Sequence, residues 1–388
     1  MIHPIRTWNR FFFGMTSARP LGAIRIGFGL LALANLALCA VDLDHWWSDA
    51  GLLRGDEQRV LAGAWLISPL HYIQTPVAAR AAFGFTALAA LGLTVGWRTK
   101  LMSILFYGGM LSIHNRNTVS CSGADVLLMV FAFNLMLSPC GLAYSVDAWL
   151  ARRKRGGTAA EPIMLLWPYR LFQLQSSLVY GLAAILKCGG NLWLNGSALH
   201  YVLNNTEVRR LDFSFLSSYP ILINLMTYSA LAFEFALTFL IWFRAVRPAV
   251  IAAGVMLHLG ILATVNIPIF GELMWLGYLA FLTPPEFQAM VRAVSIRPWA
   301  RRAAPVADVP ETVPVEKSTR ATEVAAIDPE PASPAATPPA RPMMIRIDRP
   351  EGVPAPHTSR PDAAGELPGE REYVEATIDP YDSFQILM

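Results

Sequence analysis

Long apolar runs alternate with short polar connections along most of the chain. Each run is about 17–25 residues long, the length that a helix needs to cross the hydrocarbon core of a bilayer. Eight runs are predicted as spans: Pro20–Val41, Val77–Gly96, Leu101–Thr118, Ala124–Pro139, Pro168–Cys188, Pro220–Phe243, Pro248–Val265 and Pro268–Thr283. The pattern therefore predicts an all-α fold, a polytopic transmembrane helix bundle of about eight spans.

Composition agrees with a membrane protein. The 388 residues are 54% hydrophobic and only 15% charged, and the mean hydropathy is +0.41. A water-soluble domain needs a more polar exterior. The net charge of +3 is small, and no basic run is interleaved with aromatic residues. These features exclude nucleic acid as a partner and make the lipid bilayer the expected one.

Positive charges fall in every second connection between the runs. They are Arg6, Arg10, Arg19, Arg98, Lys100, Arg152, Arg153, Lys154, Arg155, Arg244, Arg247, Arg301 and Arg302. If all eight runs cross the membrane, every one of these residues lies on the same side. The positive-inside rule makes that side cytoplasmic. We therefore expect an integral, multi-pass membrane protein with both termini in the cytoplasm.

The two ends of the chain differ from the apolar region between them. Residues 1–19 include "IRTWNRFFFGM", a mixture of aromatic and basic residues that predicts an interfacial cytoplasmic segment. Residues 301–388 are rich in Pro and Ala, as in "DPEPASPAATPPARP", and predict a disordered cytoplasmic tail with an unknown partner. Its end, "YDSFQILM", fits a docking peptide and a frayed terminus equally well.

The fifth run carries a polar stripe. Its members recur at helical spacing: Gln173, Ser176, Ser177, Tyr180, Ala184 and Lys187. The other faces of this helix carry leucine, isoleucine and valine. A polar stripe that faced lipid would leave hydrogen-bonding groups unpaired in hydrocarbon. We therefore expect the stripe to face neighbouring helices or a cavity.

Two interpretations fit Lys187, at the end of this stripe. A lysine within a turn of the helix end can snorkel, lifting its ammonium to the headgroups. Alternatively, an apolar pocket can hold the lysine as a neutral amine, which acts as a general base. Position alone favours snorkelling, whereas the stripe of Gln, Ser and Tyr beneath the lysine favours the base.

Three further polar residues interrupt the apolar runs: Arg25, Glu234 and His258. Each is expected to face the bundle interior and to find a partner there. Arg25 and Glu234 are a candidate ion pair, and a structural and a functional role fit both equally well. His258 is more typical of a packing residue than of a ligand. No second His or carboxylate lies at metal-binding spacing near it, so no metal site is predicted.

A polar group lies around the third-to-fourth turn. Asn115, Arg116, Asn117 and Asp125 fit either the lip of a polar pocket or a solvated turn, and the turn is favoured. Cys39, Cys121 and Cys188 are all predicted near the outer face, where one disulfide can form. Isolated small apolar residues are the favoured interpretation of these cysteines.

The segment "YGLAAILKCGGNLWLNGSALHY", residues 180–201, resembles the signature of the horizontally transferred transmembrane (HTTM) domain. That domain is also the membrane part of the vitamin K-dependent gamma-glutamyl carboxylases. "PLGAIRIGFGLL", "HNRNTVSCSGADVLL", "YRLFQLQ" and "HLGILATVNIPIFGELMWLGYLAFLTP" are similar to the family as well. The likeness covers roughly 18–285, and we place an HTTM-like transmembrane domain at 20–290. Lys187 followed by Trp193 and Gly196 is its most specific element.

The resemblance implies a chemistry for Lys187. In the carboxylases, a lysine seven residues after the tyrosine of this helix deprotonates vitamin K hydroquinone, and Lys187 after Tyr180 corresponds to that position. The reduced quinone then reacts with oxygen to give an epoxide and a strong base, which enables carboxylation of a glutamate. By the same resemblance, Tyr180, His258, Gln173 and Trp193 are expected to bind the quinone, while Gly196 belongs to the turn.

Two departures narrow this expectation. The carboxylases carry a histidine before their fourth-span aspartate, whereas this chain has polar, non-imidazole residues around 117–120. They also have a large lumenal region that holds the peptide substrate, and the outer loops predicted here are too short for one. Carboxylase-like quinol chemistry is therefore the first hypothesis. A non-catalytic lipid- or quinol-binding membrane component is the second, and a proton-coupled transporter is the third.

Overall fold

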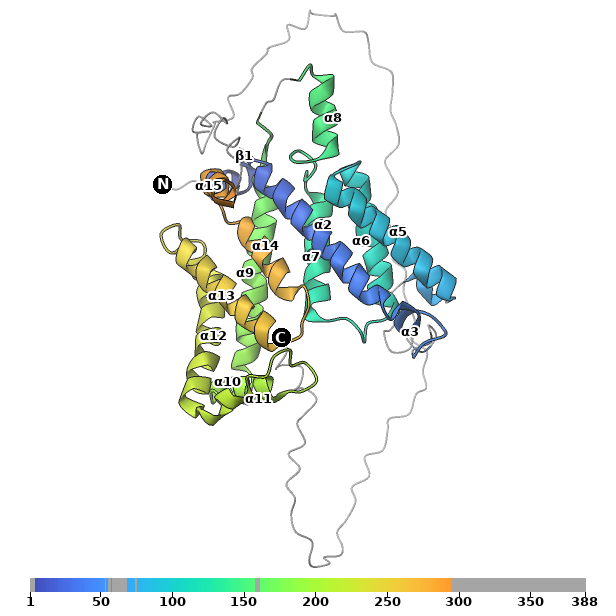
Figure 1. Cartoon of the computed structure of the whole chain (residues 1–388). Helices are drawn as coiled ribbons and strands as arrows, with labels where there is room; N and C mark the ends of the chain where they lie inside the picture. Colours follow the sequence, from blue (N-terminus) through green and yellow to red (C-terminus); the bar gives the residue numbers. More distant parts are fainter. Residues whose placement is uncertain are drawn as a thin grey trace, which may run out of the picture. The chain divides into compact units, whose positions relative to one another are not determined.

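The computed structural model describes residues 4–52, 54, 57, 68–73, 75–157 and 161–294, and this part of the chain is mostly helical (Figure 1). The α-helices are α1 (Pro4–Phe13), α2 (Arg19–Ala40), α3 (Leu43–Trp47), α5 (Pro76–Val95), α6 (Thr99–Arg116), α7 (Gly123–Leu137), α8 (Val146–Lys154), α9 (Trp167–Cys188), α10 (Asn191–Leu194), α11 (Ala198–Asn204), α12 (Pro220–Leu240), α13 (Arg247–Thr264), α14 (Phe270–Leu279) and α15 (Pro284–Val294). Two 3₁₀ turns, η1 (Pro69–His71) and η2 (Ser214–Ser218), lie between them. Every run predicted as a span is helical at its predicted place.

Five of the described helices are long and apolar enough to cross a membrane: α2, α5, α9, α12 and α13. The apolar helix α7 is shorter, at 15 residues. Helix α14 has only 10 residues, so it rises about 15 Å, half the thickness of a bilayer core of about 30 Å. The membrane character of the fold is thus supported by five long helices, fewer than the eight spans that the apolar runs predict.

One small sheet departs from the expected all-α fold. Strand β1 (Met15–Ser17) pairs antiparallel with β2 (Ile163–Leu165). Just beyond β2, the Tyr169 hydroxyl donates to the Ser17 carbonyl at 2.9 Å and accepts from the Leu21 N–H at 2.9 Å. Strands of three residues are too short to show alternation in sequence. The sheet fixes the start of α2 beside the start of α9.

The helices pack in two groups. Helices α2, α5, α6 and α7 lie together, and α9 lies with α12, which also packs on α13 (Figure 1). Helix α14 contacts α2, α7, α9 and α13, and so joins the groups. Edge-to-face aromatic pairs fill the core, with ring centroids 5.6 Å apart for Phe28 and Phe106 and 5.1 Å apart for Phe131 and Phe172.

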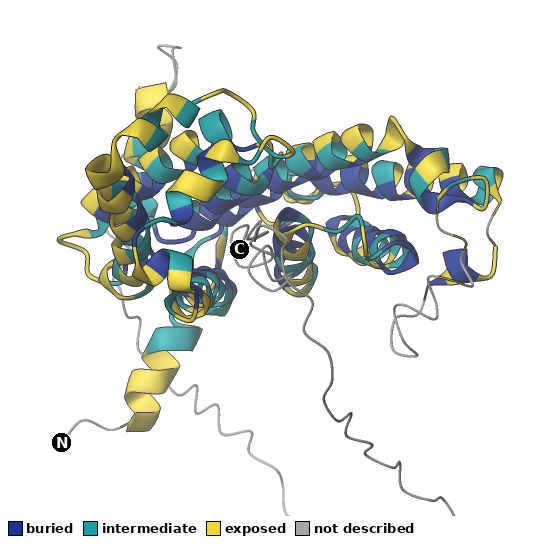
Figure 2. Ribbon diagram, turned by 90° about the horizontal axis from the view of Figure 1, so that it is seen from below, coloured by how far each residue is buried: buried dark blue, intermediate teal, exposed yellow. Residues whose placement is uncertain are grey.

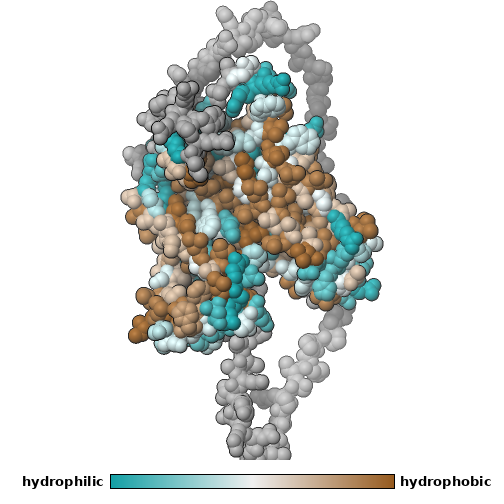
Figure 3. Space-filling model, in the orientation of Figure 1, coloured by the Kyte–Doolittle hydropathy of each residue, from teal (hydrophilic) through white to brown (hydrophobic). Residues whose placement is uncertain are grey.

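Exposed residues lie along the outer faces of these helices (Figure 2), and many of them are large and apolar, so hydrophobic surface covers much of the face seen in Figure 3. On α9, Leu178, Leu182 and Ile185 are 61%, 57% and 61% exposed, on the side opposite the polar stripe. Apolar surface of this extent is typical of lipid contact and not of a protein surrounded by water.

Contacts between distant segments gather the basic connections at one end of the bundle. The Asp147 N–H donates to the Gly96 carbonyl at 3.0 Å, and the Arg247 guanidinium donates to the Phe281 carbonyl at 3.0 Å. We call this the basic end, defined by its basic residues Arg19, Arg98, Lys100, Arg152, Arg153, Lys154, Arg155, Arg244 and Arg247. The pairing of β1 with β2 and the contact between the Phe11 and Trp242 rings bring the remaining segments to the same end. Nine of the thirteen basic residues predicted on one side therefore lie at one end of the bundle, Arg301 and Arg302 lie outside the described residues, and the side of the membrane stays a prediction.

Helix α1 packs against this end as well. The Arg170 guanidinium lies 4.1 Å from the centroid of the Phe11 ring and donates to the Phe11 carbonyl at 3.0 Å. Ile5 and Trp8 remain 70% and 60% exposed. Exposed aromatic and aliphatic groups beside arginines suit the predicted interfacial role, which stays a prediction. The predicted tail, 301–388, lies outside the described residues.

Candidate functional site

The polar stripe of α9 faces the protein interior, as predicted. Its members are all buried: Gln173, Ser176, Ser177, Tyr180, Ala184 and Lys187. Its serines meet neighbouring helices. The Trp242 indole N–H donates to the Ser177 hydroxyl at 3.0 Å, and Ser176 packs against Gly277 of α14. The stripe therefore follows the seam between α9, α12 and α14.

Lys187 turns inward and does not snorkel. Only 6% of the residue is exposed, and its Nζ lies 2.5 Å from Oε1 of Glu234 on α12. The ammonium also lies 5.0 Å from the centroid of the Trp193 ring, a cation–π distance. The sequence places Lys187 at the end of its helix, but α10 and α11 continue past that end and pack on α12. This cover is what keeps the amine from water.

The Trp193–Gly196 turn builds that cover. Helix α10 carries Trp193, which is 5% exposed, under the amine. Gly196 follows with φ +80°, a left-handed conformation that favours glycine. A Cβ at this position would lie 3.0 Å from the ring of Tyr228 on α12. Glycine thus lets the turn press against α12 and seat Trp193.

A second polar contact lies two helical turns before Lys187 on α9. The Tyr180 hydroxyl is 2.6 Å from Nε2 of His258 on α13 and 2.5 Å from the hydroxyl of Tyr278 on α14. The ring of Phe270 meets the imidazole edge to face, with centroids 5.6 Å apart. Tyr180 and His258 are therefore brought together as expected. Sequence reasoning missed Tyr278, whose only signal is a hydroxyl within an apolar run.

We call Lys187, Glu234, Tyr180, His258 and Tyr278 the polar cluster. Four helices supply it, and each member is buried. Two of its atoms, Glu234 Oε2 and His258 Nδ1, are buried without a hydrogen-bond partner among the described residues. Buried polar atoms are nearly always paired in proteins. Both atoms can therefore still form hydrogen bonds.

Gln173, predicted to bind the quinone, lies far from this cluster. Its amide donates to the Ala280 carbonyl at 2.7 Å and accepts from Arg170 at 2.7 Å, at the basic end. The 14 residues between Gln173 and Lys187 correspond to roughly 21 Å along the helix. Residues on one face of a helix can thus belong to different sites. Gln173 links α9 to the end of α14 and does not contact the polar cluster.

The candidate pair of Arg25 and Glu234 is wrong, since Glu234 binds Lys187. Arg25 is fully buried and donates to three carbonyls after α7: Cys140 at 2.9 Å, Ala143 at 3.1 Å and Tyr144 at 2.6 Å. The guanidinium satisfies carbonyls that follow a helix end, a structural role for which five fixed donors are suited.

The polar residues that lead into the turn between α6 and α7 are buried, although the turn itself is partly exposed. Arg116 and Asn117 are both fully buried, and the Asn117 amide donates to the Trp46 carbonyl at 2.9 Å. The Asn115 carbonyl lies 2.9 Å from Nε2 of His71. Asp125 caps α7 through Ser122 and lies 3.5 Å from His114. These residues join segments, and they lie apart from the polar cluster. All four cysteines are free thiols, as the favoured interpretation expected.

The family model for the HTTM domain matches residues 13–285. The chain belongs to the HTTM-domain family. The match spans every helix of the polar cluster and ends close to the predicted limit of the membrane domain. Searches among curated proteins and among solved structures gave no match.

Proposed function

We propose that this HTTM-domain protein is a membrane enzyme that takes a proton from a quinol, with Lys187 as the base. The observation that carries the proposal is the buried contact of 2.5 Å between Lys187 Nζ and Glu234 Oε1. A lysine that served only to anchor the helix end would need neither burial nor a carboxyl partner.

The pair can hold its mobile proton on either partner. With the proton on the amine, the pair is ionic, and burying two charges is costly even when they attract each other. With the proton on the carboxyl, both groups are neutral and the Lys187 amine can accept another proton. Glu234 thus positions the amine and takes up the amine's own proton. The resulting ammonium is stabilised by the Trp193 ring 5.0 Å away and by the anion left behind.

The residues of the polar cluster fit a quinol. Glu234 Oε2 and His258 Nδ1 are the two unpartnered atoms of the cluster. The quinol hydroxyls can donate to the first, and they can donate to or accept from the second. Reduced vitamin K or a related quinol, when bound, supplies the oxygen-dependent epoxidation. Tyr180 and Tyr278 fix the imidazole, and Trp193 excludes water from the amine. The apolar outer face of α9 suits an isoprenoid tail.

The proposal is narrower than glutamyl-peptide carboxylation. Between α9 and α12, the described residues form only α10, α11, η2 and their connections, which offer little surface for a peptide substrate. A proton-coupled transporter is less well supported, because Arg25 is engaged by three carbonyls and does not join the polar cluster.

For the topology, we infer that the chain crosses the bilayer eight times. The five long helices, α6 and α7 make seven crossings, and the eighth is made by α14 together with the residues on either side of it, since α14 alone is too short. An even number of crossings puts both termini and every second connection on the same side, which agrees with the gathering of basic residues at one end. The positive-inside rule then places that end, and both termini, in the cytoplasm. Lys187 and Trp193 would lie toward the outer half of the membrane.

A direct test incubates the purified protein with a reduced naphthoquinone and oxygen and measures the epoxide. Wild type should form epoxide. Lys187→Arg should form at least about 100-fold less, since an arginine keeps the positive charge but cannot be deprotonated. Lys154→Arg, at an exposed site on α8, should retain wild-type activity.

Two results would contradict the proposed enzymatic role. Equal product from Lys187→Arg and wild type would remove Lys187 as the base. A wild-type protein that binds the quinol yet forms no epoxide would instead be the non-catalytic quinol-binding component.

A further inference from the structure

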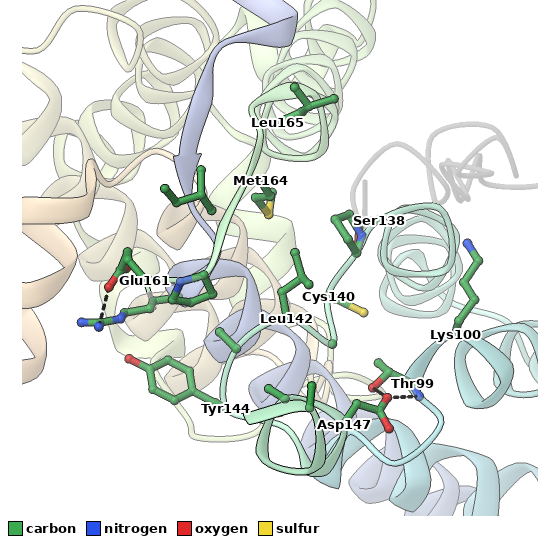
Figure 4. Close-up of a pocket in the computed structure, with 18 of the residues that line it drawn as sticks. Thr99, Lys100, Ser138, Cys140, Leu142, Tyr144, Asp147, Glu161, Met164 and Leu165 are labelled. Atoms are coloured by element: carbon green, nitrogen blue, oxygen red, sulfur yellow. Dashed lines mark hydrogen bonds and ion pairs between the residues drawn. The ribbon is translucent and has the colours of Figure 1, made fainter. Parts of the chain in front are cut away.

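A cleft opens at the basic end of the bundle (Figure 4), and no residue of the polar cluster lines it. Its volume is about 1440 Å³, larger than the roughly 300–1,000 Å³ typical of small-molecule pockets. Residues on the starts of α2, α6 and α9, on the end of α7, along α8 and on β2 line it. Because four membrane-region helices begin or end here, the cleft lies at the level where a bilayer passes from hydrocarbon to headgroups.

Basic side chains outnumber acidic ones in the lining. Arg19, Lys100, Arg152 and Arg155 face two acids, Asp147 and Glu161. Both acids already have partners. Glu161 binds Arg19 at 2.6 Å, and Asp147 accepts from the Thr99 hydroxyl at 2.6 Å (Figure 4). The lining thus carries four basic residues against two acidic ones, and Arg152 and Arg155 lie in the last turn of α8 and directly after it.

The rest of the lining is apolar. Leu142, Met164 and Leu165 extend the wall toward the bundle (Figure 4), and Leu137 and Trp167 complete it. A cleft with a cationic rim and an apolar wall, at the edge of the membrane region, is complementary to a molecule with an anionic head and a hydrocarbon body. A soluble anion would use the rim alone and would leave the wall exposed to water.

We propose that this cleft binds the headgroup of an anionic phospholipid, with the phosphate near Arg152 and Arg155 and the first part of an acyl chain along the apolar wall. Basic pockets at membrane-helix ends are suited to such headgroups. Helix α8 is short, and its last three residues and the residue that caps it, Arg152–Arg155, are all basic. Only the first and last of these four line the cleft.

That difference supplies a matched control. Arg152→Gln/Arg155→Gln removes two positive charges from the cleft. Arg153→Gln/Lys154→Gln removes the same charge from the same helix, at residues outside the lining. All four side chains are exposed, so neither double variant removes a core contact.

The experiment measures binding of phosphatidylglycerol to the detergent-purified full chain by native mass spectrometry, with phosphatidylcholine as the neutral lipid. We expect Arg152→Gln/Arg155→Gln to weaken phosphatidylglycerol binding by about tenfold or more. The control pair should leave it within about twofold, and phosphatidylcholine should bind weakly to every form.

Three outcomes would overturn the site. Equal losses in the two double variants would reduce the effect to general surface charge. Equal binding of the two lipids would remove the role of the anionic headgroup. Competition by millimolar inorganic phosphate as strong as that by the lipid itself would assign the cleft to a soluble anion.

Discussion

At the scale of single residues, the position of Lys187 is decided by its neighbours. An isolated helix ending in lysine would place the ammonium in the headgroups. Here Glu234 supplies an opposite charge and Trp193 supplies both a cover and an aromatic face. These two contacts outweigh the hydration that the Lys187 amine would gain in the headgroups. If the amine moved there, the Glu234 carboxylate would be left buried without its partner.

This argument predicts strong coupling between the two partners. Glu234→Leu alone should destabilise the protein by about 3–5 kcal/mol, since it leaves the Lys187 ammonium buried without its carboxylate. Lys187→Met/Glu234→Leu should recover most of that loss, because two apolar side chains of similar size suit the site. Unfolding of the detergent-purified variants measures both values. Additive losses in the double variant would show that the contact is unimportant for stability.

At the scale of elements, short connections decide how the long helices are arranged. Strands β1 and β2 hold α2 to α9, and Trp193 and Gly196 seat the α10 turn on α12. Asp147, on α8, performs the same role at the basic end. Its carboxylate accepts from the Arg98 N–H at 2.9 Å and the Thr99 N–H at 2.7 Å.

Asp147 gives a pH-dependent prediction for α8. Partial burial alone would raise the pKa of Asp147, but the hydrogen bonds from Thr99 and Arg98 outweigh it, and the pKa lies below its ordinary value of 3.8. A carboxyl with a depressed pKa stabilises the fold above its unfolded-state pKa and loses that contribution as the pH falls through the folded-state pKa.

Asp147→Asn should therefore lower the melting temperature at pH 7, and the difference from wild type should shrink as the pH falls below 3.8. Thermal unfolding of both proteins in detergent, at pH 7 and at a pH below 3.8, checks this prediction. Asp49→Asn, at an exposed residue, should leave the melting temperature unchanged. A deficit for Asp147→Asn of the same size at both pH values would mean that hydrogen bonding to the neutral acid suffices.

At the scale of the whole molecule, orientation follows from where the basic connections gather. The positive-inside rule applies to lysine and arginine near helix ends. The basic end carries such residues from the start of α2 and from three connections between membrane helices. Helix α8 should therefore lie in the cytoplasm, and the segment between α11 and α12 should lie outside.

A membrane-impermeant maleimide tests this topology in intact cells. In a chain whose four native cysteines are replaced by serine, Glu207→Cys should be labelled and Lys154→Cys should be labelled only after lysis. Both positions are exposed. Labelling of Lys154→Cys in intact cells would reverse the orientation. Labelling of both positions would contradict the single crossing, by α9, that separates them.

The amino-acid sequence by itself determined the membrane class, the helical fold and the places of the main helices, because each depends on local composition and on the 3.6-residue period. It also determined that the α9 stripe faces inward, since hydrocarbon does not satisfy polar groups. The family likeness that singled out Lys187 belongs to this level too.

Only the tertiary structure decided which polar groups meet. Glu234 pairs with Lys187, 47 residues away, whereas Arg25, its predicted partner, donates to the carbonyls after α7. The Tyr278 hydroxyl meets that of Tyr180, 98 residues away. Gln173, on the same face of α9 as Tyr180, instead bonds to the Ala280 carbonyl at the basic end. Periodicity fixes the face of a helix that a side chain occupies, but the partner depends on which helix packs there and at what height along it.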